Sequence, residues 1–218
     1  MSVSAYGAVA AMLADEFNEL PTARWLSGDP EERRKAVRGQ FELLVEHALG
    51  HGGVVTSGDL DGAVVWFDHT AGAPPIPGYD ERLAEACGPV VDRFRHLDQV
   101  MEDHHPDVPH HYVALVGVRE AKRGNGIASA MLRRHHRVLD RDGIPAYLEA
   151  VSPETARLYG TLGYEPLGER YGLEDGGPFL YPMWREPQAL CGGGGPPGPP
   201  PSSPANIDTL DYTKPGSV

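Results

Sequence analysis

The chain has 218 residues, of which 40% are hydrophobic, and a formal net charge of -12 at pH 7. This length is enough to bury one core, and no apolar run approaches the length that spans a membrane. The acidic balance argues against general nucleic-acid binding, which relies on basic patches to neutralise phosphates. Because the N-terminus lacks a basic region followed by an uninterrupted apolar segment, we expect a cytoplasmic protein. The two cysteines are far apart and form no CxxC motif, so neither a disulfide framework nor a cysteine zinc site is predicted.

Two helices are predicted in the first quarter of the chain. Residues 4–17 repeat hydrophobic side chains at helical spacing, and Pro21 ends this region. Asp29 is positioned to cap a second helix, with Pro30 at the first helical position and Glu32 completing a capping box.

The next part of the chain predicts a hairpin and then an interrupted helix. Residues 54–56 and 63–67 alternate in the manner of two paired strands, with a glycine-containing turn between them. A helix from Asp80 is interrupted near Gly88 and resumes as far as Met101.

Four histidines lie in the segment that follows, residues 103–111. Such a group suggests metal ligation, but adjacent histidines do not easily face one ion together. We interpret the segment as a solvated connection braced by prolines, and no metal site is predicted.

The stretch from His111 to His136 predicts a strand, a tight turn and the start of a helix. Residues 112–118 are an apolar run of strand length, and apolar residues recur at helical spacing after Gly126. Glycine permits the sharp turn between them. The first amide groups of a helix that opens on small residues are free to bind phosphate oxygens. The stretch does not fit GxxxxGK[ST], and no strand-linked GxGxxG occurs, which excludes P-loop and Rossmann sites.

Two strands and a short helix are predicted after this stretch. Residues 145–151 form a buried strand, and residues 153–162 form a helix that carries Tyr159. Residues 164–173 and 179–184 then predict a closing pair of strands around a glycine-containing turn.

The composition changes near the end of the chain. From Gln188 it is dominated by glycine, proline and serine, which cannot bury enough apolar surface to fold. We therefore expect one folded domain over residues 1–187 and a disordered tail over residues 188–218.

Residues 123–128 (RGNGIA) fit R/Q-x-x-G-x-G/A, the pyrophosphate loop of GCN5-related N-acetyltransferases (GNAT), at every specified position. The order of predicted elements resembles the GNAT fold over about residues 3–186. That resemblance implies an α/β (α+β) fold, with a mixed, mostly antiparallel sheet that is splayed at its central strands and flanked by helices. The family's first edge strand is missing from this sequence. Residues 158–164 and 178–184 further resemble the branch that contains puromycin N-acetyltransferase and related small-molecule enzymes.

The resemblance implies acetyl-CoA as the cofactor. Its pantetheine arm would bond the backbone of the central strand, and its pyrophosphate would take amide hydrogens from the turn and the first helical turn. The implied cofactor-binding residues are Val116, Gly117, Val118, Arg123, Gly124, Asn125, Gly126, Ile127, Ala128, Ser129, Thr155 and Tyr159. Thr155 replaces an asparagine that is common in the family, so we expect weaker cofactor binding.

The resemblance also implies the catalytic residues. Tyr159 matches the family tyrosine that protonates the departing thiolate, and tyrosine is a proton donor throughout the physiological range. Glu149 lies on the strand beside the central one, where the family often places a base or a substrate-holding carboxylate, and apolar neighbours would raise its pKa. A backbone amide near Val118 would polarise the thioester carbonyl. Further candidates for the base are Glu102, Asp103, His110 and His111.

The implied function is transfer of an acetyl group to an amine of a small molecule, such as an antibiotic or a biosynthetic intermediate, by direct attack. One alternative is a non-catalytic acyl-CoA-binding or sensor protein of the same fold. Another is a protein or peptide N-acetyltransferase whose tail recruits a partner. The expected partner is a small-molecule amine, with no nucleic acid and no membrane, and the chain would be a monomer or a homodimer.

Overall fold

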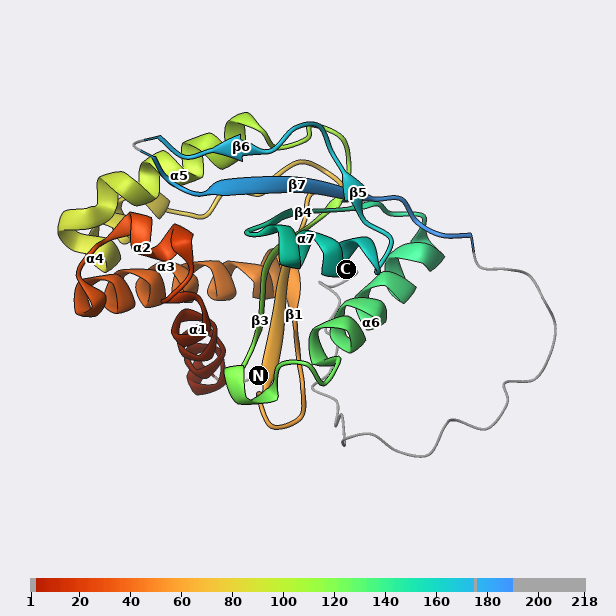
Figure 1. Ribbon diagram of the computed structural model, residues 1–218, viewed down its shortest axis with the longest axis horizontal. Helices are drawn as coiled ribbons and strands as arrows, with labels where there is room; N and C mark the ends of the chain where they lie inside the picture. The colour runs from red at the N-terminus through yellow and green to blue at the C-terminus, as the bar shows by residue number, and fades with distance from the viewer. Residues whose placement is uncertain (1–2, 175, 190–218) are drawn as a thin grey trace.

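A central sheet organises the protein, and the computed structural model describes residues 3–174 and 176–189 (Figure 1). The described strands are β1 (Gly52–Thr56), β2 (Gly62–Asp68), β3 (His111–Val118), β4 (Ala146–Ala150), β5 (Glu165–Pro166), β6 (Tyr171–Gly172) and β7 (Phe179–Arg185). Their order in the seven-stranded sheet is β1–β2–β3–β4–β7–β5, and β6 also pairs with β7. Strands β3 and β4 are parallel and the other pairs are antiparallel, which confirms the predicted mixed, mostly antiparallel sheet.

Helices cover both faces of this sheet. The described helices are α1 (Val3–Phe17), α2 (Pro21–Leu26), α3 (Pro30–His51), α4 (Tyr79–Cys87), α5 (Val91–Asp103), α6 (Ile127–Asp142) and α7 (Pro153–Gly160), with short 3-10 turns η1 (Gly88–Val90) and η2 (Glu120–Lys122). In Figure 1, α1, α2 and α3 lie on one side of the β1–β3 strands, and α6 lies on the other. Within the described part of the chain, no strand precedes α1.

Two hydrophobic cores fill the space between the helices and the sheet. One core joins α1, α3 and α5 to the sheet and includes Leu13, Val65 and Leu115. The other joins α6 and α7 to the opposite face and includes Val64 and Leu148. Neighbouring residues of β2 thus serve different cores, because successive side chains of a strand point to opposite faces.

The two central strands separate soon after they meet. Strands β3 and β4 pair only at His111–Ala146 and Tyr112–Tyr147, and β3 then continues beside β2 alone. The register between β2 and β3 shifts between Val65 and Trp66, where β3 has one additional residue. Such a bulge bends its strand and often lies beside a functional site. The predicted splay of the central strands is therefore confirmed.

The N-terminal helices follow the sequence signals with one correction and one additional helix. Oδ1 of Asp29 accepts hydrogen bonds from the amides of Glu31 and Glu32 at 3.0 and 2.8 Å, so the predicted cap of α3 is confirmed. The Glu32 carboxylate, however, accepts from the Ser27 hydroxyl at 2.6 Å instead of closing a capping box. Helix α1 ends before Pro21, as predicted, and Pro21 also begins the short helix α2, because proline suits the first turn of a helix.

The C-terminal part of the sheet is shorter than the sequence predicts. Residues 164–173 hold the two-residue strands β5 and β6 instead of one strand, and the residues between them are exposed. Gly168, with a φ of +77°, turns the chain there. The amide of Gln188 donates to Asp140 Oδ1 at 2.8 Å, and the rest of the predicted tail, from residue 190, lies outside the described residues.

None of the helices in residues 3–174 and 176–189 is both long enough and apolar enough to cross a membrane.

Candidate active site

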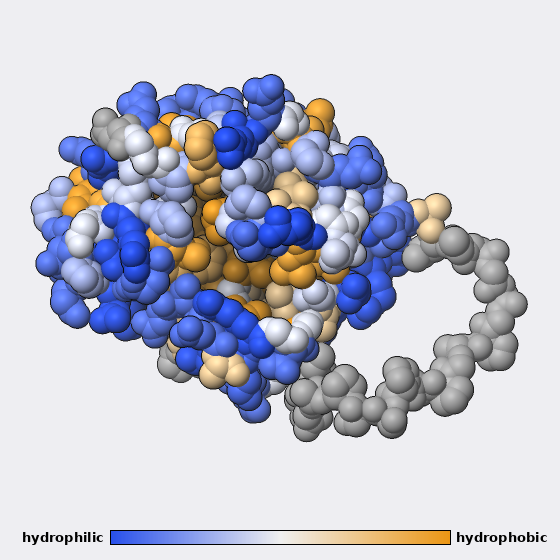
Figure 2. All heavy atoms as spheres, viewed as in Figure 1, coloured by the Kyte–Doolittle hydropathy of each residue, from blue (hydrophilic) through white to orange (hydrophobic). Residues whose placement is uncertain are grey.

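A cavity of about 510 Å³ opens where β3 and β4 separate. Helices α1, α2, α3 and α5 form one wall, and β3, β4 and α7 form the other. Figure 2 shows that this face of the molecule is hollowed near its middle and that hydrophobic surface is exposed in the hollow. A mostly apolar cavity with a few polar groups is typical of a small-molecule site.

The end of β3 forms the wall that the sequence predicts for pantetheine. Val116, Gly117 and Val118 all line the cavity, and beyond Tyr112 no strand of the described residues pairs with β3 on the β4 side. A Cβ atom on Gly117 would lie 2.6 Å from Leu13 Cδ2, so glycine lets α1 pack close to the strand. An extended group therefore finds an unpaired strand edge with free backbone groups here.

The predicted pyrophosphate loop continues from β3 into α6. Gly124 and Gly126 have φ values of +79° and +74°, which only glycine adopts without strain, and Gly126 is the N-cap of α6. Asn125 braces the turn by donating to the carbonyls of Lys122 and Arg123. The turn is exposed, and the amides of Ile127, Ala128 and Ser129 belong to the first helical turn, where no intrahelical partner exists. These groups fit an anion such as a pyrophosphate.

Arg123 connects this loop to the cavity. Its Nη2 lies 2.7 Å from Glu16 Oε2, and its Nε donates to the Val118 carbonyl. Both Arg123 and Glu16 line the cavity. No pattern in the sequence indicates Glu16, which belongs to α1 and meets the loop only in the folded protein.

Glu149 lies in the cavity wall and accepts hydrogen bonds from three tyrosines. Its Oε1 accepts from the Tyr147 hydroxyl at 2.9 Å and from the Tyr171 hydroxyl at 3.4 Å, and Tyr112 adds a further hydrogen bond. Burial raises the pKa of Glu149 to about 7, although these hydroxyls lower it in part. The carboxyl group therefore exchanges its proton near neutral pH, as a general base does.

Tyr159 lines the cavity from α7. Its side chain is buried, and burial raises its pKa to about 12, so the hydroxyl keeps its proton at neutral pH. Within the described residues, this hydroxyl donates to no other group, and its proton is free for a bound molecule.

Thr155 also reaches the cavity, but its hydroxyl is engaged locally. It donates to the Ser152 carbonyl at 3.0 Å and accepts from the Ser152 amide at 3.1 Å, which closes the capping box of α7. Its predicted contact with the cofactor remains a prediction.

Asp98 is a cavity residue that the sequence did not reveal as a site. Its carboxylate accepts from the Tyr79 hydroxyl at 2.9 Å and from Gln40 Nε2 at 3.3 Å. Burial raises the pKa of Asp98 to about 6, so most of it is ionised at pH 7. Asp98 lies one helical turn from both Phe94 and Glu102, and this spacing on a predicted helix is the one signal that could have indicated it.

Only one of the other four candidates for the general base lines the cavity. Glu102 lines the cavity, whereas Asp103, His110 and His111 do not. The predicted solvated connection is wrong for the two histidines, since His110 is 1% exposed and His111 is 4% exposed. Packing against aromatic rings of the sheet, including Trp66 and Tyr147, buries them.

Comparisons with known proteins agree with this geometry. Residues 83–167 match the model of the acetyltransferase (GNAT) domain. A Corynebacterium glutamicum protein, described as histone acetyltransferase HPA2 and related acetyltransferase, is 27% identical, with a TM-score of 0.62 over 88% of this chain and 96% of its own.

Two more distant structures share the fold. A Drosophila melanogaster polyamine N-acetyltransferase is 18% identical, with a TM-score of 0.58 over 85% of this chain and 97% of its own. Arylalkylamine N-acetyltransferase 2 from Aedes aegypti is 14% identical, with a TM-score of 0.56 over 86% and 97%. Residues 83–167 thus match a GNAT acetyltransferase domain, the domain of acyl-CoA-dependent N-acetyltransferases that use acetyl-CoA, and the described fold extends this similarity over most of the chain.

Proposed function

We propose that the protein acetylates the amine of a small molecule that is largely apolar and carries a cationic nitrogen. One observation carries this proposal. Glu149, Tyr159 and the unpaired edge of β3 all line the same apolar cavity. Asp98 and Glu102 add negative charge to the cavity, which favours a protonated amine.

The donor-binding residues are proposed on the same geometry. The backbone of Val116 to Val118 would hold the pantetheine arm, and Arg123 with the amides of residues 124–129 would hold the pyrophosphate. Acetyl-CoA supplies the acetyl group as a thioester. Thr155 would add at most a weak contact, because its hydroxyl already bonds Ser152.

Two side chains carry out the proton transfers, Glu149 as the base and Tyr159 as the acid. The cationic amine first loses one proton to solvent, and Glu149, with a pKa of about 7, takes the second proton as the neutral nitrogen attacks. The amide near Val118 polarises the acyl carbonyl. As the carbon–nitrogen bond forms and the carbon–sulfur bond breaks, Tyr159 gives its proton to the sulfur.

The acceptor is proposed to be an antibiotic-like amine or a biosynthetic intermediate. Its apolar part would lie against Phe17, Phe41 and Leu97, which line the cavity from three helices. The resemblance of residues 158–164 and 178–184 to the puromycin N-acetyltransferase branch supports the antibiotic-like choice.

A panel assay tests the proposal. Purified enzyme and acetyl-CoA are incubated with amines that differ in apolar size, and the appearance of free thiol is followed. Turnover should be greatest for amines with an aromatic or branched apolar group and smallest for short polar amines. Tight CoA binding by calorimetry without turnover of any amine would instead favour the acyl-CoA-binding or sensor alternative. Turnover of peptides alone would favour the peptide acetyltransferase.

A further inference from the structure

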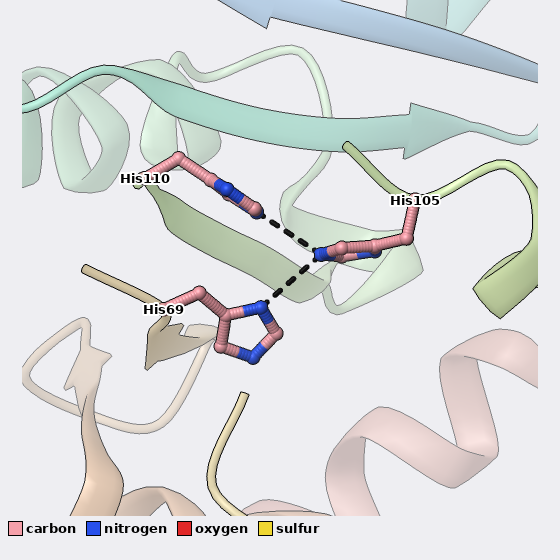
Figure 3. Close-up of side chains that lie close together, drawn as sticks. All are labelled: His69, His105 and His110. Atoms are coloured by element: carbon pink, nitrogen blue, oxygen red, sulfur yellow. Dashed lines mark hydrogen bonds between the residues drawn. The ribbon is translucent and has the colours of Figure 1, made fainter. Parts of the chain in front are cut away.

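Three histidines from separate segments meet at one end of the cavity. His69 follows β2, His105 follows α5, and His110 precedes β3. Figure 3 shows the three rings turned toward a common point. The His69 amide donates to the His110 carbonyl at 2.9 Å, which holds two of the segments together. The cluster is therefore fixed by the backbone of the fold as well as by side chains.

His105 Nε2 makes two short contacts with other ring nitrogens, and hydrogen bonding can satisfy only one of them. His105 Nε2 lies 3.1 Å from His69 Nδ1 and 3.0 Å from His110 Nε2. An imidazole nitrogen offers either one proton or one lone pair in the ring plane, so His105 Nε2 makes at most one full hydrogen bond. Two contacts thus compete for one position.

The tautomer of His110 means that its Nε2 cannot donate a hydrogen bond to His105. Its Nδ1 lies 2.7 Å from the Val108 carbonyl and must donate to it, which leaves Nε2 as a bare lone pair when the ring is neutral. A histidine whose second nitrogen donates to a carbonyl is the usual arrangement of a metal ligand, because that bond fixes the ring and raises its basicity.

A single cation would satisfy all three nitrogens at once. The three ligand atoms lie within 4.8 Å of one another. In a tetrahedral zinc site with bonds of about 2.0–2.1 Å, ligand nitrogens are about 3.3 Å apart. The two distances from His105 Nε2 are slightly shorter than this, and the His69 and His110 nitrogens lie within 4.8 Å of each other, so ring rotations would bring the three nitrogens around one ion.

Neighbouring aromatic rings hold the three ligands in place. The ring of Tyr112 packs on both His69 and His105, and Tyr147 packs on His105 and His110. When His69 carries its proton on Nε2 and His105 carries its proton on Nδ1, all three facing nitrogens present a lone pair that can bind an ion.

We propose that His69 Nδ1, His105 Nε2 and His110 Nε2 form a binding site for a divalent transition metal of the zinc class. Imidazole suits zinc, copper, nickel and iron, and the absence of oxygen ligands among the three disfavours magnesium and calcium. Three protein ligands leave a fourth position for water or another donor. His69 and His105 line the same cavity as Glu149, so the ion lies at the acceptor end of the proposed active site.

Metal analysis of the full chain tests the site without reference to catalysis. Tag-free protein is stripped with a chelator, titrated with Zn²⁺ in a calorimeter, and assayed for bound metal after dialysis. We expect about one zinc ion per chain. Co²⁺ in the same position should give the intense visible absorption of a tetrahedral complex.

Variants assign the ligands. His69→Gln and His105→Gln should each weaken Zn²⁺ binding by more than the about 10–100-fold that loss of an outer-shell partner costs. His104→Gln is the matched control, because His104 is exposed beside His105 and its ring stacks on Tyr171. Circular dichroism of each variant separates loss of a ligand from loss of the fold.

Two outcomes would overturn the proposal. One is a wild-type chain that keeps no stoichiometric zinc after dialysis. The other is binding that survives His69→Gln and His105→Gln but disappears in His47→Gln/His51→Gln, because those two rings also lie close together, with centroids 4.5 Å apart on α3. That result would assign the ion to the helix pair.

Discussion

The hydroxyl of Tyr147 donates to Oε1 of Glu149 at 2.9 Å, from the same face of β4. This bond stabilises the ionised carboxylate, whereas burial favours the protonated form, and burial is the larger effect. The result is an acidic group with a pKa of about 7 in the wall of the cavity. Its position and its pKa lead to the first two predictions.

Glu149→Gln should lower kcat about 10²–10⁴-fold, because glutamine keeps the hydrogen bonds to the tyrosines but accepts no proton. Wild-type kcat/KM should rise with pH through about 7, as the carboxyl group becomes a base. Free-thiol release measured from pH 5.5 to 9 checks both statements. Glu165→Gln, an exposed carboxylate on β5, is the control and should retain activity. An unchanged kcat in Glu149→Gln would assign the base to another residue.

Glu149 should also make the fold less stable as the pH rises. Its folded-state pKa of about 7 lies above its ordinary value of 4.5, so the folded protein holds this proton more tightly than the unfolded chain. The free energy of unfolding therefore falls between about pH 5 and pH 7. Relative to wild type, Glu149→Gln should gain on the order of 1 kcal/mol from pH 5 to pH 8, or about 2–4 °C in Tm. Thermal melts at both pH values measure the gain, and equal Tm differences at the two would contradict the raised pKa.

The parts of the site that could be predicted are those held within one local motif. Apolar spacing and glycine positions predict the strand, turn and helix over residues 111–142, and a local pattern predicts their cofactor role, which stays a prediction. Tyr159 and Glu149 likewise follow from single elements. Helical spacing places Asp98 on the face of α5 that carries Phe94 but does not place it in a site, and nothing local indicates His69. Both residues line the cavity only through the packing of distant segments.

The histidine segment shows the same limit. Its sequence, rich in proline and polar residues, is typical of an exposed connection. His110 is buried because β3 begins immediately after it and Tyr147 and Trp184 pack on its ring. Burial of a short polar segment is decided by distant partners, which spacing along the chain does not reveal.

Tyr159→Phe should reduce kcat about 10²-fold or more while the Kd of acetyl-CoA changes little. The phenyl ring preserves the packing of α7, and only the proton for the thiolate is lost. Stopped assays for kcat and calorimetry for CoA binding separate the two effects. Tyr181→Phe, on β7 and outside the cavity lining, is the control. A variant with wild-type kcat would show that solvent protonates the thiolate.

Arg123 and Glu16 should have opposite effects on donor binding. Arg123→Ala removes the cation expected to meet the pyrophosphate, so the Kd of CoA should rise about tenfold, and less at high salt. Glu16→Gln breaks the 2.7 Å ion pair and releases Arg123, so the Kd should fall. Arg119→Ala, an exposed arginine whose Nε donates to the Leu60 carbonyl, should leave the Kd unchanged. Calorimetric titrations of the three variants decide the point, and weaker binding in Glu16→Gln would mean that the ion pair positions the arginine instead of competing for it.

Asp98→Asn should weaken binding of the acceptor amine and leave binding of the acetyl donor unchanged. The carboxylate is mostly ionised at pH 7 and is held in the cavity wall by Tyr79 and Gln40, so it attracts a protonated amine. Asparagine keeps the size of the side chain and loses its charge. KM for a cationic amine should rise about tenfold, with kcat and the Kd of CoA within a factor of two. Asp92→Asn, exposed on the same helix and paired with Arg95, controls for loss of one surface charge. A purely electrostatic effect depends on the charge of the amine. If the KM of an uncharged analogue of the amine rises equally, Asp98 therefore shapes the cavity wall instead of attracting charge.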